Sequence, residues 1–257
     1  EKIVLVIFIL LIVIIFIIWR RNKKQSERTK RGTVAAIAVT ENTRGINAWW
    51  QRTYSSLKYA KYVIFHPFDG FWDLKHEKRG NFSASIIILM LVGATYIFLR
   101  QYTGFVFNTR NLSQLNIFTE MISVIIPFLL WCGVNWSLTT LMDGKGRLKE
   151  IFIASAYALV PIIVINIPIT IISNYMTLEE GSFYNFFIVF AVIWAMTLLL
   201  LGTMVTHDYT MSKTLLTVIG IVVGIGFVLF IGLLFFSVVD VVIKFVTDIY
   251  KEMVFRI

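Results

Sequence analysis

Apolar residues along this chain occur in six long blocks that polar stretches separate. Each block holds close to 20 mostly apolar residues, which as an α-helix cross about 30 Å of hydrocarbon. A backbone in lipid must satisfy its own hydrogen bonds, so these blocks are predicted to be helices. The predicted spans are Ile3–Ile18, Ser83–Leu99, Ile117–Leu138, Ile151–Ser173, Phe186–Val205 and Leu215–Ser237. We therefore expect an all-α integral membrane protein.

The first block, within residues 1–19, is expected to be a transmembrane anchor. It enters apolar sequence directly after Glu1-Lys2, and its basic cluster, Arg20 to Lys24, follows the apolar core. A signal peptide carries its basic residues ahead of the core, so this order is typical of a stop-transfer segment. Because residue 1 is not Met, we expect a further domain on the outer side to precede it.

Composition and charge give the orientation. The chain is 58% hydrophobic, with a mean hydropathy of +0.78, and carries a net charge of +9. Most basic residues lie between the first two spans, with further ones near Lys145 and Lys213. The positive-inside rule places these connections in the cytoplasm. Six spans then put both ends of the chain outside. Because the basic residues flank spans, the charge does not indicate nucleic-acid binding.

Residues 20–64 are predicted to form a basic cytoplasmic linker that contains an interfacial helix. The helix, Ala48–Ile64, is rich in aromatic and lysine side chains. Trp49 and Trp50 are candidate membrane or partner contacts, because tryptophan favours the headgroup layer. A helix on the inner membrane surface and a helix docked on a cytoplasmic partner both fit. Thr33–Thr40 fits either a strand-like or a disordered segment.

Residues 238–257 are predicted to form a separate amphipathic helix on the outer side. Its apolar face holds Val239, Val242, Val246, Ile249, Met253 and Ile257, and charged residues lie opposite. Such a face fits the outer leaflet, a partner or an outer domain.

The segment Phe65–Gly80 leads into the five spans of residues 65–237. Pro67 disfavours helix at His66 and ends the preceding helix. Phe68, Phe71 and Trp72 are expected to face the membrane interface, with Asp69 and Asp73 toward water. The segment could set the angle of the next span or contact a partner.

Few polar residues lie within the spans. Glu120 is a candidate functional group, since intramembrane ionisable residues are costly, and it lies near the outer boundary. Asn135 and Asn166 are expected to form hydrogen bonds between helices. Gly220 and Gly224 form a small-residue face that fits packing within the chain and packing against another subunit equally well.

No catalytic, cofactor or metal set is evident. Cys132 stands alone in a span, and His66, His76 and His207 are expected at the surface. Asp143-Gly144-Lys145-Gly146 lacks the full phosphate-loop pattern, so a tight turn is predicted. His207 and Asp208, with Asp143, are the one candidate for an enzymatic cluster. We expect a protein that is not an enzyme and that uses no cofactor and no metal.

Three segments carry a family resemblance. They are His66–Trp72 followed by Lys78-Arg79-Gly80, then Asp143–Gly146, and then Ala156–Pro161. In this order they resemble bacterial proteins of the Yip domain family, named for Ypt/Rab-interacting proteins. The resemblance covers roughly residues 65–237 and implies a five-span helical domain.

The resemblance also implies a function. It suggests a non-enzymatic accessory or scaffold subunit of a larger bacterial plasma-membrane complex, such as an ABC-type sugar transporter. Expected partners are membrane lipids and other integral membrane subunits, transporter permeases included. The alternatives are a self-contained transporter or channel, which would need charges at the midplane, and a protein that organises membranes or trafficking.

Overall fold

The computed structural model describes residues 37–108 and 115–255. The chain divides into two compact units, Glu1–Tyr54 and Ser55–Ile257. The border falls within helix α2 (Ile37–Phe65). In the first unit, the rings of Trp49 and Trp50 meet edge to face, 4.8 Å apart. The helix includes Ile37–Thr40, so the strand-like alternative for those residues is wrong. The predicted anchor lies outside the described residues.

The described residues of the second unit form helices joined by short loops, with no strand among them. After the end of α2 come α3 (Pro67–His76), α4 (Phe82–Tyr102), α5 (Ile117–Leu141), α6 (Leu148–Ala158), α7 (Val160–Ile172), the 3₁₀ turn η2 (Leu178–Glu180), α8 (Gly181–His207) and α9 (Met211–Phe255). Five helical segments are long and apolar enough to cross a membrane, with α6 and α7 together forming one of them. Five of the six predicted spans are therefore confirmed as helices of sufficient length and apolar character.

The third span is divided in two by local chemistry. Helix α6 ends at Ala158 and α7 begins at Val160. Pro161 has no backbone N–H, so the i→i−4 ladder is interrupted at this position. The backbone continues through tighter bonds, from Leu159 N to Ala156 O and from Ile162 N to Leu159 O. The third span is therefore broken into two helices next to Pro161.

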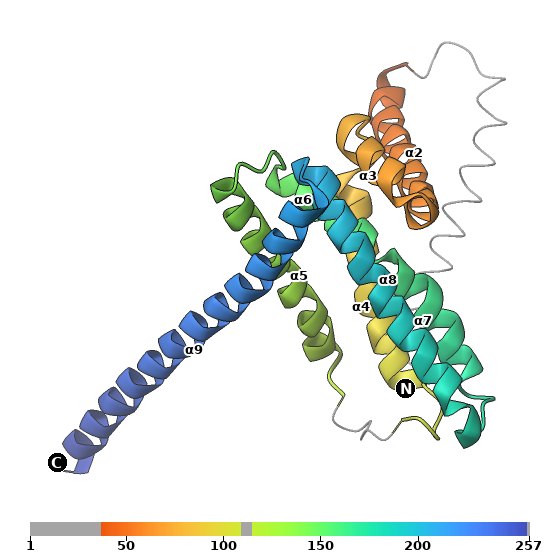
Figure 1. Ribbon diagram of the computed structural model, residues 1–257. Coiled ribbons are helices and arrows are strands. Elements are labelled where there is room, and N and C mark those ends of the chain that lie inside the picture. The colour runs from red at the N-terminus through yellow and green to blue at the C-terminus, as the bar shows by residue number, and fades with distance from the viewer. Residues whose placement is uncertain (1–36, 109–114, 256–257) are drawn as a thin grey trace. The chain divides into compact units, whose positions relative to one another are not determined.

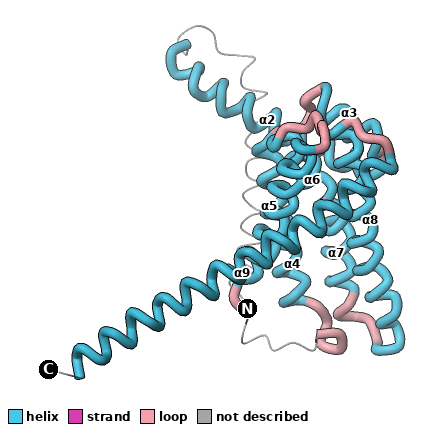
Figure 2. The backbone as a smooth tube through the Cα atoms, turned by 60° about the vertical axis from the view of Figure 1, so that its left-hand side comes forward, coloured by secondary structure: helices cyan, strands magenta, loops and turns pink. Residues whose placement is uncertain are grey.

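The core of the unit is centred on α6. Helix α6 contacts α3, α4, α5 and α8. Figures 1 and 2 show α4, α7 and α8 running side by side next to it. Ala156 and Ala158 are fully buried, and small side chains let helices approach closely where lipid supplies no hydrophobic driving force. Tyr157 lies between them, completely buried.

Helices α5 and α9 pack on each other through the two predicted glycines. A Cβ on Gly220 would lie 2.9 Å from Leu138, and one on Gly224 would lie 2.7 Å from Val134. The small-residue face thus serves packing within the chain.

Helix α9 differs from the sequence prediction at its C-terminal end. A span ending at Ser237 and a separate helix from Val238 were expected, but α9 runs unbroken over 45 residues. The chain has no proline after Pro168 and no glycine after Gly232, so nothing local ends the helix at Ser237. The correction concerns the boundary at Ser237, because the last span and the predicted amphipathic helix form one continuous helix.

Polar contacts join the end of α4 to the start of α5 and to the end of α7. Arg100 on α4 donates to both carboxylate oxygens of Glu120 on α5, at 2.7 and 3.1 Å. Gly104 N donates to Ser173 Oγ at 2.9 Å, which ties the end of α4 to the end of α7. Glu120 is thus neutralised by a neighbouring helix, an arrangement typical of charges at a bilayer edge.

Gly104 provides a test of this packing. A Cβ there would lie 2.2 Å from the carbonyl oxygen of Ser173, a backbone atom that cannot move aside. We expect Gly104→Ala to lower the free energy of unfolding by about 1–3 kcal/mol through overpacking. The matched control is Gly133→Ala on α5, where nothing lies within 4 Å. Thermal unfolding in detergent should show a loss for the first variant and none for the second. Equal melting temperatures for both would contradict the packing described.

Candidate functional site

The segment Ser55–Gly80, here called the elbow, folds the end of α2 back against α3. Helix α2 ends at Phe65, and Pro67 begins α3 where a missing N–H is tolerated. Gly70 lies so close to α2 that a Cβ there would be 2.8 Å from Val63 Cα. Only glycine permits this approach, so the local sequence determines the tight angle.

The elbow is fastened to the membrane bundle by buried contacts. The hydroxyl of Tyr157 donates to Ser56 O at 2.9 Å, and Ser56 Oγ donates to Arg79 O at 2.8 Å. Phe71 is 2% exposed, and a Cβ on Gly202 of α8 would lie 3.1 Å from its ring. The elbow is therefore held in one position on α6 and α8.

A network of polar side chains supports the elbow from within. Tyr59 Oη donates to Asp73 Oδ2 at 2.5 Å, and Arg79 lies over the Tyr59 ring, 5.4 Å from its centroid. Burial, with the hydrogen bond to Asp73, raises the pKa of Tyr59. The hydrogen bond to Glu77 raises the pKa of Arg79. These groups hold one another and are not free for chemistry.

The aromatic residues predicted at the membrane interface divide into two groups. Phe68 and Trp72 are about half exposed and Asp69 is exposed, as expected. Phe71 is buried in the core and makes no outside contact, which corrects the prediction. Asp73 was expected to face water, but its carboxylate accepts a hydrogen bond from Tyr59. The helix period explains this, because Phe68 and Trp72 are four residues apart on one face and Phe71 lies off it.

A second cluster lies where α8 ends. His207 is 1% exposed, and its Nδ1 accepts from Gly146 N at 3.3 Å. The neutral ring therefore carries its proton on Nε2. A Cβ on either Gly144 or Gly146 would lie 2.7 Å from the imidazole. The predicted turn at Asp143–Gly146 is confirmed, and the expectation of a surface histidine is wrong for His207.

The residues after His207 connect three segments. Lys75 Nζ of α3 lies 2.7 Å from Asp208 Oδ1, and Lys145 Nζ lies 3.6 Å from Asp208 Oδ2. Tyr209 Oη donates to Met142 O at 3.0 Å. Burial alone would raise the pKa of Asp208, but the hydrogen bond and charge of Lys75, aided by Lys145, hold it below its ordinary value. Asp208 thus acts as an ion-pair centre.

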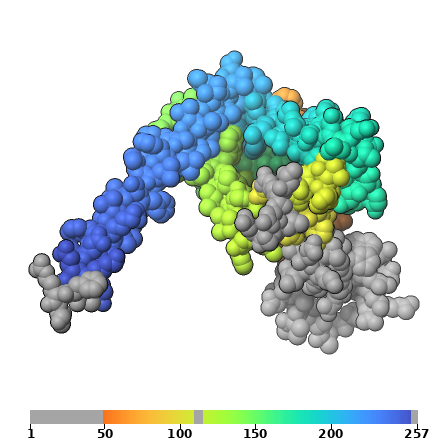
Figure 3. All heavy atoms as spheres, turned by 90° about the horizontal axis from the view of Figure 1, so that it is seen from below, coloured from red at the N-terminus to blue at the C-terminus, as the bar shows by residue number. Residues whose placement is uncertain are grey.

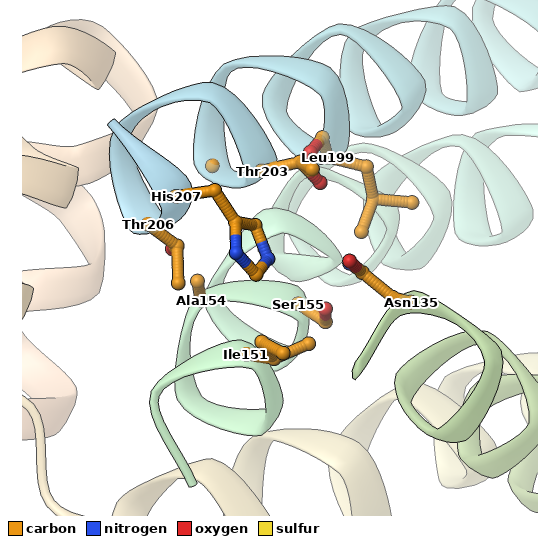
Figure 4. Close-up of a pocket in the computed structure, with 9 residues that line it drawn as sticks. Asn135, Ile151, Ala154, Ser155, Leu199, Thr203, Thr206 and His207 are labelled. Carbon is orange, nitrogen blue, oxygen red and sulfur yellow. Dashed lines mark hydrogen bonds between the residues drawn. The ribbon is translucent and has the colours of Figure 1, made fainter. Parts of the chain in front are cut away.

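A narrow pocket lies beneath this cluster, between α5, α6 and α8 (Figure 4). Two buried atoms at its lining have no hydrogen-bond partner among the described residues, Asn135 Oδ1 and His207 Nε2. The space is too narrow for the centre of a water molecule. It is therefore not a substrate cavity, and each unpaired group costs about 1–3 kcal/mol.

The remaining predicted residues are accounted for individually. Asn166 Oδ1 is buried without a partner, like Asn135 Oδ1, so the interhelical bonds expected of these two oxygens are absent from the described residues. Cys132 is buried as a free thiol. Within residues 37–108 and 115–255, no group of three or more His, Cys, Asp or Glu is placed to hold a metal ion.

Two ion pairs were not predicted from the sequence, Arg100 with Glu120 and Lys75 with Asp208. His207 was grouped with Asp143 as a candidate enzymatic cluster, but its packing against the Asp143–Gly146 turn was not predicted. In each case the two partners lie in different segments of the chain. The sequence around His207 contains no local signal that its ring packs against the two glycines of the turn.

The comparison with family models decides the family. The Yip1 domain model matches residues 61–233, most of the chain. The chain belongs to the Yip1 domain family. No curated protein and no solved structure matches it. The matched range begins in the last turn of α2 and ends within α9, so it includes residues 61–80 of the elbow, the first four described spans and the first half of α9.

The ion pair of Asp208 predicts a pH dependence. Its pKa is lowered in the folded state, so the pair stabilises the fold above the ordinary aspartate pKa of about 4, and this stabilisation is lost as the pH falls below it. The carboxylate is 41% exposed, so screening keeps the effect small. We expect the melting temperature of Asp208→Asn to fall less than that of the parent chain between pH 7 and pH 3. Parallel curves for the two proteins would contradict the role of Asp208.

Proposed function

We propose that the protein is a non-enzymatic scaffold subunit of a larger complex in a bacterial plasma membrane. Its partners in this proposal are membrane lipids and other integral membrane subunits, including permeases of ABC-type sugar transporters. The observation that carries the proposal is the elbow, a rigidly held segment at the membrane border with an exposed aromatic face.

The geometry of the elbow supports docking. Phe68 and Trp72 project from one face of α3 and Asp69 is also exposed, while Phe71 on the inner side packs the helix against α8. Side chains that are already ordered lose little entropy when a partner covers them. Large aromatic anchors of this kind carry much of the binding energy at protein interfaces.

The structural contacts of the polar groups around Asp208 and His207 favour a scaffold role over catalysis. Asp208 pairs with Lys75 and Lys145, and His207 Nδ1 accepts from the backbone of Gly146. The charged and polar groups nearest to a catalytic cluster are therefore engaged in holding α3, the Asp143–Gly146 turn and α8 together.

A self-contained transporter or channel receives less support. Glu120, the one acidic residue of the α5 span, is paired with Arg100 near the end of the helix. The pocket around Asn135 and His207 is closed to water. The alternative of a membrane-organising or trafficking protein uses the same elbow, with lipid in place of a protein partner.

The test is purification of the full-length protein from its own membrane in mild detergent, with mass spectrometry of what accompanies it. Permease or other integral subunits in fixed ratio are expected. The paired change Phe68→Ala and Trp72→Ala should weaken their retention by at least about thirty-fold, since a single hot-spot anchor contributes about 2 kcal/mol or more. Both side chains are exposed, so the variant should fold normally.

The matched control is Phe183→Ala. Phe183 is also an exposed aromatic residue, but it lies at the start of α8, at the opposite end of that helix from His207. Its substitution should leave the retained subunits unchanged. A protein that purifies with lipid and with no other protein would overturn the scaffold proposal and favour the membrane-organising alternative.

A further inference from the structure

Helix α9 is longer than a bilayer needs. At 1.5 Å per residue its 45 residues extend about 68 Å, against about 30 Å of hydrocarbon. Even a tilt of 40° uses only about 26 residues within the hydrocarbon. Because α9 begins at Met211, shortly after α8 ends, the residues beyond about Ser237 emerge on the far side.

The emerging part does not turn along the membrane surface. A helix lying flat on the leaflet would need a break at the membrane border, and α9 continues unbroken to Phe255. Figure 1 shows it as one rod, and Figure 3 shows its C-terminal half standing clear of the other coloured atoms. A Cβ on Gly226 or Gly232 would likewise meet nothing within 4 Å. The C-terminal part of α9 therefore projects away from its own bundle.

The projecting part carries an apolar seam. Val239, Val242, Val246 and Ile249 follow one another at intervals of three, four and three residues, and Met253 continues the series in the sequence. This is the a and d spacing of a coiled coil. Val242, Val246 and Ile249 are 54%, 59% and 42% exposed within the chain. These side chains would face water unless another helix covers them.

The charged residues lie off the seam. Asp240, Lys244, Asp248 and Lys251 occupy the outward b, c and f positions, and Glu252 occupies a g position that flanks the seam. Lys244 Nζ pairs with Asp240 Oδ2 at 2.7 Å along the same helix. The seam itself holds no charge, so two identical seams can meet without like charges facing each other.

We propose that the seam Val239–Ile249 associates with the same seam of further copies of this chain, as a parallel coiled coil outside the bilayer. Copies inserted in one membrane with one orientation present α9 in the same direction, so equal residues meet about a symmetry axis along the membrane normal. Ile243 and Phe245 flank the seam with more apolar surface, which accommodates two or more copies. The inference uses no residue of the elbow and stands apart from the proposed function.

The test is disulfide crosslinking of the full chain in its own membrane. Cys132 is the one cysteine of the chain and is replaced by alanine to give a background without thiols. Single variants Val242→Cys and Val246→Cys place thiols on the seam, and Lys244→Cys and Lys251→Cys place them outside it. A disulfide needs its Cβ atoms about 4 Å apart, so seam variants should crosslink chain to chain at least ten-fold more than outward variants.

Mass spectrometry of the crosslinked product identifies the partner. Products made only of this chain, as dimers or as noncovalent assemblies of such dimers, support the proposal. Equal crosslinking at all four positions, no crosslinking at any, or a crosslink to another protein at the seam would overturn it.

A second variant separates association from folding. Val246→Asp places a charge on the seam, and Val246 is exposed in the single chain, so the Yip1 domain should keep its melting temperature. In the Val242→Cys background this change should abolish the crosslink, whereas Lys251→Asp, a change of charge off the seam, should leave it in place. A crosslink that survives Val246→Asp would sink the proposal.

Discussion

The close packing of α6 against its neighbours is the constraint on which the described domain depends. In lipid, burying apolar surface between helices gives little free energy, because the surface is already in an apolar solvent. Association therefore depends on close van der Waals packing and on hydrogen bonds between helices. The fully buried Ala156 and Ala158 let neighbouring helices approach α6, and Tyr157 between them reaches the backbone of Ser56. A larger residue at either alanine would separate the helices and withdraw the hydroxyl that positions the elbow.

Polar chemistry is confined to the two ends of this packed centre. On the side predicted to be cytoplasmic, Lys75, Asp208 and the Asp143–Gly146 turn join α3 to α8. On the other side, Arg100 pairs with Glu120, and Ser173 accepts from Gly104. Charges close to a bilayer edge keep partial access to water, so pairing there is less costly than at the midplane. The unpaired oxygens of Asn135 and Asn166 are the exceptions in the interior.

Helices α5 and α9 extend the domain beyond the packed centre. Gly220 and Gly224 join them over the first part of α9, and beyond Gly224 the helix has open space around it. In the membrane, lipid covers such a surface at no cost. Beyond the membrane, lipid no longer covers the apolar side chains of α9. This change of solvent along one continuous helix is the reason that the projecting seam needs another helix to cover it.

The sequence by itself determined that the protein lies in a membrane, that it is helical, where the five described spans lie, and which segments resemble the family. The thickness of the bilayer sets the length of the apolar blocks. Pro67, Pro161 and the Asp143–Gly146 turn interrupt helices locally, so their effect depends only on neighbouring residues in the chain. Only the tertiary structure decided that Phe71 is buried, that His207 lies under two glycines, that Arg100 neutralises Glu120, and that α9 continues past Ser237. The first three depend on contacts between helices that local pattern does not encode. The last was not predicted from hydropathy, which suggested a boundary at Ser237, whereas the structure has one continuous helix with no proline or glycine after Gly232 to end it.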